Sequence, residues 1–208
     1  MRVLVGCEES GIVREAFRKL GHEAYSNDLV PARDNSAYHL QMDVNAAVES
    51  GPWDIIILFP PCTAMAVSGN STYAKGKAKY KERLEAYVWT AKLWSTAKAT
   101  AKYGVALENP IGLPPYKMAG GLAQYIHPYM FGHMEQKKTM IIRWGLPKLI
   151  ATKDVYADMM MLQKRQRERV HYMSPGPNRA RDRSATFSGI ADAMATQWGN
   201  RDKLKWTY

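Results

Sequence analysis

Cysteine is scarce in this chain of 208 residues, which has only two, Cys7 and Cys62. Two thiols could form at most one disulfide, so the chain is not a disulfide-stapled scaffold. Zinc sites built from several cysteines are excluded as well. The histidines are scattered without metal-ligand spacing: His22, His39, His127, His133 and His171. We therefore expect no metal site, and each cysteine is left for packing or for chemistry.

Long apolar runs are also missing. No stretch approaches the roughly 18 consecutive apolar residues that a membrane helix needs. The stretch from Met1 to Gly6 is too short for the apolar part of a signal peptide. The chain has neither a Walker phosphate loop nor the elbow motif of serine hydrolases. These absences predict a cytoplasmic protein with no membrane partner.

Acidic residues are outnumbered. The chain has 29 Lys and Arg against 19 Asp and Glu, which gives a formal net charge of +10. A basic surplus of this size favours a polyanionic partner, because neutralising phosphates releases counterions. The alternative is a soluble basic protein without such a partner. Hydrophobic residues make up 46% of the chain, enough for a sizeable core in one domain.

Short apolar runs of strand length alternate with helical patterns along the chain. Strands are predicted over residues 2–6, 23–26, 54–59, 104–107 and 139–144, and helices after Gly11, over 84–103 and over 190–198. The continuous apolar run at 54–59 is typical of a parallel strand buried on both faces. The order of elements predicts an α/β fold with a doubly wound sheet.

Chemically active side chains follow three of these strands directly. Asp28 lies past the second strand, Pro61 and Cys62 lie past the third, and Glu108 and Asn109 lie past the fourth. Ligands of doubly wound sheets bind beyond the carboxyl ends of the strands. Residues from three separate strands are therefore expected to meet at one edge of the sheet.

The sequence Pro60-Pro61-Cys62 places a thiol in a stiff turn, because proline fixes the backbone angle φ. Such a turn can hold a nucleophile in place, although a single cysteine in this position is also typical of a buried structural residue. A carboxylate at a buried strand end, such as Glu108, can have a raised pKa and donate a hydrogen bond. The alternative role for Glu108 is an ordinary turn cap.

Together, Pro61-Cys62 and Glu108-Asn109 resemble the paired signatures of the DNA (cytosine-5) methyltransferase family. The resemblance extends to Asn27-Asp28, Met42-Asp43-Val44, Ser68-Gly69, the block 132–138 and the last helix, and it covers most of residues 1–148 and 183–199. The chain is most similar to the short cytosine-methylase-like proteins encoded by bacteriophages. The protein would then be located in the cytoplasm of the host cell.

This resemblance implies a Rossmann-like S-adenosylmethionine-dependent methyltransferase fold and methyl transfer to carbon 5 of cytosine in DNA. Cys62 would add to carbon 6 of a flipped base, and Glu108 would bond ring nitrogen 3 and the exocyclic amine. Lys138 would stand in for an arginine of the family. Cofactor-binding residues would be Cys7, Glu8, Glu9, Ser10, Gly11, Asp28, Asp43 and Pro60. Substrate-binding residues would be Pro61, Ser68, Asn109, Lys75, Lys77, Lys79, Arg165, Arg167 and Arg169.

The same resemblance divides the chain into a catalytic cofactor-binding domain (1–149), a basic recognition segment (150–187) and a helix that completes the domain (188–208). The recognition segment is very reduced, since only about forty residues are available where the family has a large domain. Sequence specificity should therefore be short, absent or supplied by another chain. A homodimer is one such arrangement, because a small subunit offers little surface to DNA.

Two departures from the family leave alternatives open. Of the family's glycine-rich cofactor loop only Gly11 is kept, and Met140 stands where a second arginine is usual. One alternative is a non-catalytic nucleic-acid-binding protein that keeps the fold. Another keeps the chemistry and changes the acceptor to RNA or a free nucleotide.

Overall fold

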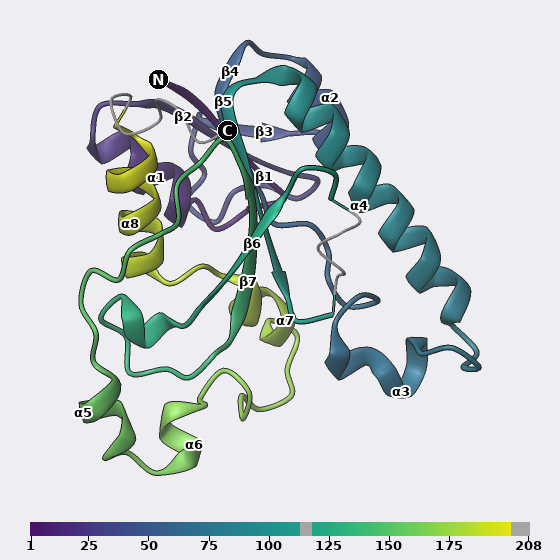
Figure 1. Cartoon of the computed structure of the whole chain (residues 1–208), viewed down its shortest axis with the longest axis vertical. Helices are drawn as coiled ribbons and strands as arrows, with labels where there is room; N and C mark the ends of the chain where they lie inside the picture. Colours follow the sequence, from purple (N-terminus) through teal and green to yellow (C-terminus); the bar gives the residue numbers. More distant parts are fainter. Residues whose placement is uncertain (113–117, 201–208) are drawn as a thin grey trace.

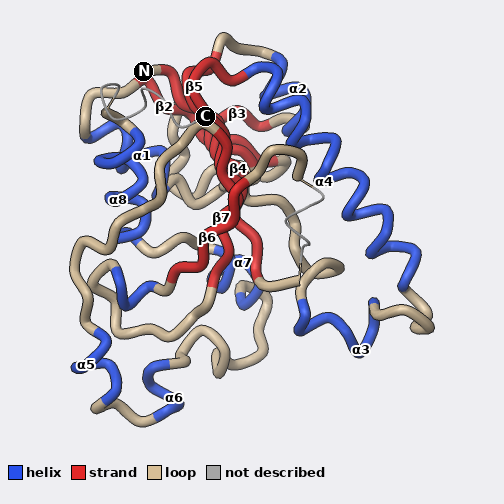
Figure 2. The backbone as a smooth tube through the Cα atoms, viewed as in Figure 1, coloured by secondary structure: helices blue, strands red, loops and turns tan. Residues whose placement is uncertain are grey.

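A seven-stranded sheet forms the centre of the protein (Figures 1 and 2). The computed structural model describes residues 1–112 and 118–200. The strands are β1 (Arg2–Gly6), β2 (Glu23–Asp28), β3 (His39–Gln41), β4 (Trp53–Leu58), β5 (Ala101–Pro110), β6 (Leu122–Ile126) and β7 (Thr139–Trp144). They lie side by side in the order β3-β2-β1-β4-β5-β7-β6.

The first five strands in chain order run parallel, and β7 is the reversed strand between β5 and β6. Ile55, Ile56 and Ile57 of β4 are fully buried, because helices cover the sheet on both sides. The prediction of a doubly wound α/β sheet with a buried parallel strand at 54–59 is thus confirmed.

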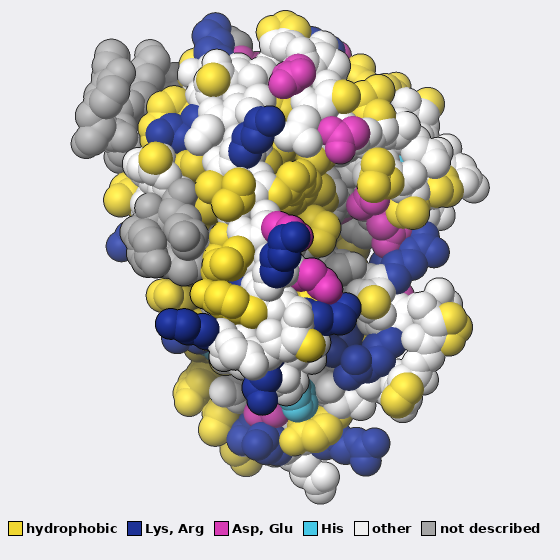
Figure 3. Space-filling view, turned by 90° about the vertical axis from the view of Figure 1, so that its right-hand side faces the viewer, with side chains coloured by type: hydrophobic (Ala, Val, Ile, Leu, Met, Phe, Trp, Pro, Cys, Tyr) yellow, Lys and Arg dark blue, Asp and Glu magenta, His cyan; other side chains and the backbone are white. Residues whose placement is uncertain are grey.

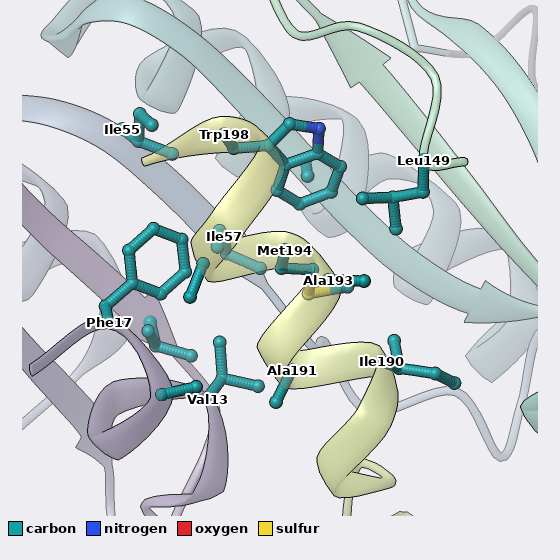
Figure 4. Close-up of a cluster of buried hydrophobic side chains, with 14 of the residues drawn as sticks. Val13, Phe17, Ile55, Ile57, Leu149, Ile190, Ala191, Ala193, Met194 and Trp198 are labelled. Atoms are coloured by element: carbon teal, nitrogen blue, oxygen red, sulfur yellow. The ribbon is translucent and has the colours of Figure 1, made fainter. Parts of the chain in front are cut away.

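Helices form a layer on each face of the sheet (Figure 1). On one face lie α1 (Ile12–Lys19) and α8 (Ser188–Trp198), and on the other lie α2 (Val44–Glu49) and α4 (Tyr80–Thr100). Figure 4 shows how α8 closes the first face, with Trp198 on the side of Leu149 and Met194 beside Ile57. The indole Nε1 of Trp198 donates to the carbonyl oxygen of Pro147 at 3.0 Å. The last helix is therefore part of the core on this face of the sheet.

The long helix α4 is shifted from its predicted bounds of 84–103. It begins four residues earlier and ends at Thr100, where β5 takes over. Alanine and lysine favour helix at this end of the segment. Ala101 nevertheless pairs with Trp53 of β4, and the gain from sheet pairing overrides the local propensity. Three elements, β3, α2 and β6, were not predicted.

The region 150–187 contains three short helices, α5 (Tyr156–Met160), α6 (Lys164–Arg167) and α7 (Arg179–Ser184). In Figure 1, α5 and α6 lie at the lower end of the molecule, while α7 lies beneath the carboxyl ends of the strands. Backbone contacts attach this region to residues 132–138, since Gln136 N donates to Arg167 O at 2.6 Å. Of the predicted final segment 188–208, residues 201–208 lie outside the described residues.

Among residues 1–112 and 118–200, no helix is both long enough and apolar enough to cross a membrane.

Gly11 precedes α1 with φ 73°, in the left-handed region that L side chains rarely adopt. A Cβ at this position would collide with the guanidinium of Arg14, which is fully buried against Ser26 and Asp34. We expect Gly11→Ala to lower the free energy of unfolding by about 1–3 kcal/mol, from backbone strain and the displaced arginine. Urea denaturation measures the change. Gly176→Ala is the control, because a Cβ there meets nothing within 4 Å. Equal stability of the two variants would contradict this account of the turn.

Candidate active site at the carboxyl edge of the sheet

Neighbouring strand ends bring Cys62 and Glu108 together. Leu58 at the end of β4 pairs with Leu107 of β5, so Glu108 lies level with the start of the turn that carries Cys62. The two side chains are close enough for the charge of Glu108 to act on the thiol. The structure thus brings Cys62 and Glu108 together at one edge of the sheet.

The turn after β4 holds Cys62 through its backbone. Its carbonyl oxygen accepts hydrogen bonds from Met65 N at 2.9 Å and Ala66 N at 2.8 Å. Pro60 is buried, Pro61 is exposed and Cys62 is half-buried. The thiol is therefore fixed by a bonded turn and remains within reach of solvent on one side.

Glu108 is a carboxyl group in largely apolar surroundings. Below it lies a cavity of about 20 Å³, lined by Phe59, Phe187, Ile190 and other side chains. That volume holds about one water molecule and no nucleobase, so a base would approach Glu108 from its exposed side. Burial raises the pKa of Glu108, and the nearby charge of Lys137 opposes the shift. Burial thus favours the protonated form of Glu108.

The lysine at this site is Lys137 and not Lys138, which the sequence pointed to. Lys137 lines the Glu108 cavity and acts electrostatically on both Glu108 and Cys62. Lys138 is exposed, with its Nζ 4.6 Å from the centre of the Tyr125 ring. Consecutive residues leading into a strand point to opposite faces, and the register of β7 turns Lys138 away from the nucleophile.

The surroundings of Cys62 favour the neutral thiol over the thiolate. Burial raises the pKa of the Cys62 thiol, and the charge of Glu108 raises it further. Lys137 and Arg183 lower it without outweighing the other two effects. The same burial favours the protonated form of Glu108, which carries no charge to oppose the thiolate.

The loop after β1 contains the predicted cofactor residues 7–11. Glu8 is buried, and its Oε1 accepts from Ile12 N at 2.9 Å and from Ser10 Oγ. Its Oε2 is buried without a hydrogen-bond partner in the described part of the chain. Burial raises the pKa of Glu8. A buried oxygen left open in this way is suited to a donor group on a ligand.

Glu9 is committed to protein contacts. Arg33 Nε bonds its Oε1 at 2.8 Å, and Arg181 bonds both oxygens, at 3.0 and 2.9 Å. Although partial burial opposes them, these two guanidinium groups lower the pKa of Glu9. The structure therefore joins Glu9 to α7 and not to an open ligand site.

Cys7 adopts φ 58° and is half-buried. It packs against the apolar core on the face of the sheet that α2 and α4 cover. Burial raises the pKa of its thiol to about 12, and the charges of Asp28 and Asp43 add to the shift. A thiol of this kind is inert compared with Cys62.

The two predicted aspartates have different surroundings. Asp28 ends β2, and its Oδ1 accepts from Leu29 N at 2.7 Å. Asp43 is exposed and caps α2, with its Oδ1 accepting from Asn45 N at 2.8 Å and Ala46 N at 3.4 Å. These cap bonds lower the pKa of Asp43. Asp43 thus has a structural role whether or not it also touches a ligand.

Two other predicted substrate residues differ in their exposure to solvent. Asn109 is fully buried on the face of β5 opposite Glu108, and both polar atoms of its amide lack a partner among the described residues. Ser68 is exposed in the short turn Val67–Gly69. The structure leaves Ser68 accessible and does not bring Asn109 to the surface.

Basic side chains lie on two sides of the site. Lys75, Lys77 and Lys79 are exposed beside α3 (Asn70–Tyr73), and Lys79 pairs with Glu82 at 3.2 Å. Figure 3 shows Lys and Arg side chains gathered over the lower half of the molecule.

On the α6 side, Arg165 and Arg169 are exposed. Arg169 lies 3.7 Å from Glu135. Arg167 turns inward, and its Nη1 donates to Leu162 O at 3.4 Å. Two of the three predicted arginines therefore remain accessible to a phosphate backbone.

Arg33 and Lys137 were not predicted as site residues, and Arg181 and Arg183 were expected only as part of the basic recognition segment. The sequence has two adjacent lysines, Lys137 and Lys138. Only the register of β7 shows which of the two faces the site. The arginines of 179–183 belong to the predicted basic segment, and only the tertiary fold shows that they face the strand ends.

No family model and no curated protein matches the sequence. Solved structures do match. The methyltransferase EhMeth of Entamoeba histolytica superposes with a TM-score of 0.51 over 74% of this chain at 10% identity. NSun6 from Pyrococcus horikoshii gives 0.46 over 69% at 13% identity, and the Dnmt2 methyltransferase of S. pombe gives 0.45 over 81% at 11% identity.

The chain spans 57% of the length of EhMeth, 48% of NSun6 and 56% of Dnmt2. Identities this low concern the fold alone, and the match to EhMeth supports it. With the strand order and the reversed β7, the chain has the Rossmann-like fold of S-adenosylmethionine-dependent methyltransferases, as predicted.

Replacing Lys137 tests which of the two adjacent lysines lowers the pKa of the Cys62 thiol. Lys137→Met removes a charge that lowers the pKa of Cys62, so less thiolate forms at any given pH. We expect iodoacetamide to alkylate Cys62 about three to ten times more slowly at pH 8, because the thiolate is the form that reacts. Peptide mass spectrometry distinguishes Cys62 from Cys7. Lys138→Met is the matched control and should alkylate like the unchanged protein. The reverse pattern would show that Lys138 faces the thiol.

Proposed function

We propose that this chain transfers a methyl group from S-adenosylmethionine to carbon 5 of cytosine in DNA, through a covalent Cys62 adduct on a flipped base. The observation that carries the proposal is the meeting of a thiol, a protonated carboxyl and a lysine at one strand edge: Cys62, Glu108 and Lys137. A methyltransferase fold supplies the setting.

The first task of these residues is addition to the ring. The Cys62 sulfur forms a bond to carbon 6, and the electron pair of the carbon 5–carbon 6 double bond moves toward carbon 5 and ring nitrogen 3. Glu108, which keeps its proton because its pKa is raised, donates that proton at nitrogen 3. The Glu108 carboxylate left behind then lies beside Lys137, which stabilises its charge.

Carbon 5 is now nucleophilic. S-adenosylmethionine supplies an electrophilic methyl group when bound. Once carbon 5 carries that group, a water molecule takes the remaining proton from carbon 5, the carbon 5–carbon 6 double bond forms again, and the Cys62 thiolate is expelled. Glu108 recovers the proton from nitrogen 3, and the site returns to its starting state.

Residues of the β1–α1 loop and the end of β2 fit the cofactor. The unpartnered Oε2 of Glu8 is placed to accept a hydrogen bond from an ammonium group. Asp28 at the tip of β2 is placed to bind ribose hydroxyls, as an acid at this position does in dinucleotide folds. Glu9, held by two arginines, is not needed for this role.

Exposed cations on both sides of the site fit a nucleic acid backbone. Lys75 and Lys77 lie beside α3, and Arg165 and Arg169 lie at α6. Phosphate contacts from two sides would fix the strand without reading its sequence. Base flipping from a duplex would then deliver the cytosine to Glu108.

The direct test is nucleoside mass spectrometry after incubation with S-adenosylmethionine and unmethylated duplex DNA. We expect 5-methylcytosine with the unchanged protein and none with Cys62→Ala, because the adduct cannot form. Single-stranded DNA and RNA are run in parallel. Calorimetry should show that Cys62→Ala still binds the cofactor. Modified base from the alanine variant would overturn the covalent mechanism, and modification of RNA alone would overturn the DNA acceptor.

The Glu108→Gln variant separates two effects of the carboxyl group: proton donation to nitrogen 3 and the negative charge near Cys62. Glutamine cannot deliver the proton to nitrogen 3, so methyl transfer should fall by about 100-fold or more. The same change removes a negative charge that raises the pKa of Cys62, so the thiol becomes more acidic. Alkylation of Cys62 should therefore become faster at pH values where Glu108 is ionised. A variant in which both rates fall would indicate a general loss of structure.

A further inference from the structure

The first turns of α4 extend past the carboxyl edge of the sheet and lie beside α3 (Figure 1). Arg83 belongs to this part of α4. It is half-buried, whereas Glu82 and Leu84 on either side of it are exposed. An arginine that loses contact with water needs other acceptors, because its guanidinium stays charged and has donors only.

The guanidinium of Arg83 uses all three of its nitrogens on oxygens of the protein. Its Nε donates to Ala64 O at 2.6 Å, and its Nη2 donates to Ala66 O at 3.1 Å. Its Nη1 donates to Asn70 Oδ1 at 2.8 Å. The first two acceptors are backbone carbonyls of the turn that carries Cys62, and the third is a side chain of α3.

The turn after Cys62 is thus bonded from inside and from outside. Inside, the carbonyl oxygen of Cys62 accepts from Met65 N at 2.9 Å and from Ala66 N at 2.8 Å. Outside, Arg83 takes the carbonyl oxygens of the two residues that flank Met65. Hydrogen bonds from a charged donor are stronger than those between neutral groups. The backbone that sets the direction of the Cys62 side chain is therefore held at three successive carbonyls of the turn, those of residues 62, 64 and 66.

Two further side chains on the same face of α4 contact this region. Tyr87 and Thr90 come four and seven positions after Arg83, a spacing that places side chains on one face of a helix. The hydroxyl of Tyr87 donates to Gly112 O at 3.2 Å, just past β5. Thr90 Oγ1 lies 3.5 Å from Met65 Sδ in the turn. These contacts hold α4 against the turn, so that Arg83 is aligned with the two carbonyls.

The bond between Arg83 and Asn70 adds a second link. Asn70 begins α3, and residues 74–79 connect α3 to α4. The bond therefore closes the base of the loop on which Lys75 and Lys77 are exposed. A phosphate held by these lysines is connected to the turn of the nucleophile through one guanidinium.

We propose that Arg83 is a positioning residue for the Cys62 nucleophile: its guanidinium fixes the turn 62–66, so that the thiol keeps one orientation toward the ring. Through Asn70 it also ties that turn to the lysine-bearing loop. Lysine cannot replace all three bonds, because the planar guanidinium donates in three directions from a fixed frame. The chemical purpose rests on the proposed function, whereas the hold on the turn does not.

Hydrogen–deuterium exchange measured by NMR tests the hold on the turn. Arg83→Met keeps an apolar stem and removes the three donors, so the amides of Met65 and Ala66 should exchange at least about ten times faster. Arg83→Lys keeps a charged donor and should retain part of the protection. Lys81→Met is the matched control on the same helix, because Lys81 is exposed and pairs with Glu85 at 3.6 Å. It should leave exchange in the turn unchanged.

Two reactions of the thiol separate positioning from a general loss of structure. In Arg83→Met a looser turn exposes Cys62, and burial is the largest cause of its raised pKa. Iodoacetamide, from which the thiolate displaces iodide, should therefore alkylate Cys62 about two to five times faster at pH 8, with no change at Cys7. Methyl transfer should fall about 10- to 100-fold with the KM for S-adenosylmethionine unchanged, because the thiol less often lies in line with carbon 6.

Exchange and alkylation in Arg83→Met that match the unchanged protein would overturn the proposal. So would equal acceleration of alkylation at Cys62 and Cys7 with a lowered melting temperature, which would show that the whole fold is loosened.

The outcomes for Arg83 and for the methylation reaction are separable. If Arg83→Met loosens the turn and the unchanged protein forms no methylated base on any nucleic acid, the hold on the turn stands and the proposed function fails. If 5-methylcytosine forms and requires Cys62, while Arg83→Met methylates at the same rate, the function stands and the role of Arg83 is overturned.

Discussion

The register between β4 and β5 is the constraint on which the site depends. Because Leu58 lies opposite Leu107, both strands end at the same level, and the residues that follow them meet at the edge. A slip of one residue in β5 would turn Glu108 to the other face and present Asn109 in its place. The antiparallel return of β7 then brings Lys137 to the same edge, just before Thr139 pairs with Pro110.

At this edge, burial raises the pKa of Cys62 and of Glu108, and the charge of Lys137 lowers both. Cys62 needs to lose a proton and Glu108 needs to keep one, and both groups have a raised pKa. The two requirements support each other, because a neutral Glu108 no longer opposes the thiolate. Lys137 favours the ionised form of each group, so its benefit to the thiol comes with a cost to the protonated carboxyl.

The sequence was sufficient for five of the seven strands and for the thiol–carboxyl pair, since both follow from local patterns. Apolar runs marked β1, β2, β4, β5 and β7, and the residues after β4 and β5 were the ones that met. It was not sufficient for Lys137, because side-chain direction near β7 depends on register with β5. Nor was it sufficient for Arg181, whose partner Glu9 lies far away in the chain. Contacts between distant loops are decided by tertiary packing, which leaves no periodic trace in the sequence.

The measurement that tests the central claim most directly is trapping of the adduct with duplex DNA containing 5-fluorocytosine. Fluorine at carbon 5 cannot leave as the proton does, so the Cys62–carbon 6 bond formed during methyl transfer would persist. The account predicts a complex that survives denaturation, requires S-adenosylmethionine, and maps by mass spectrometry to the peptide containing Cys62. A complex that still forms with Cys62→Ala, or the absence of any complex while ordinary cytosine is methylated, would contradict it.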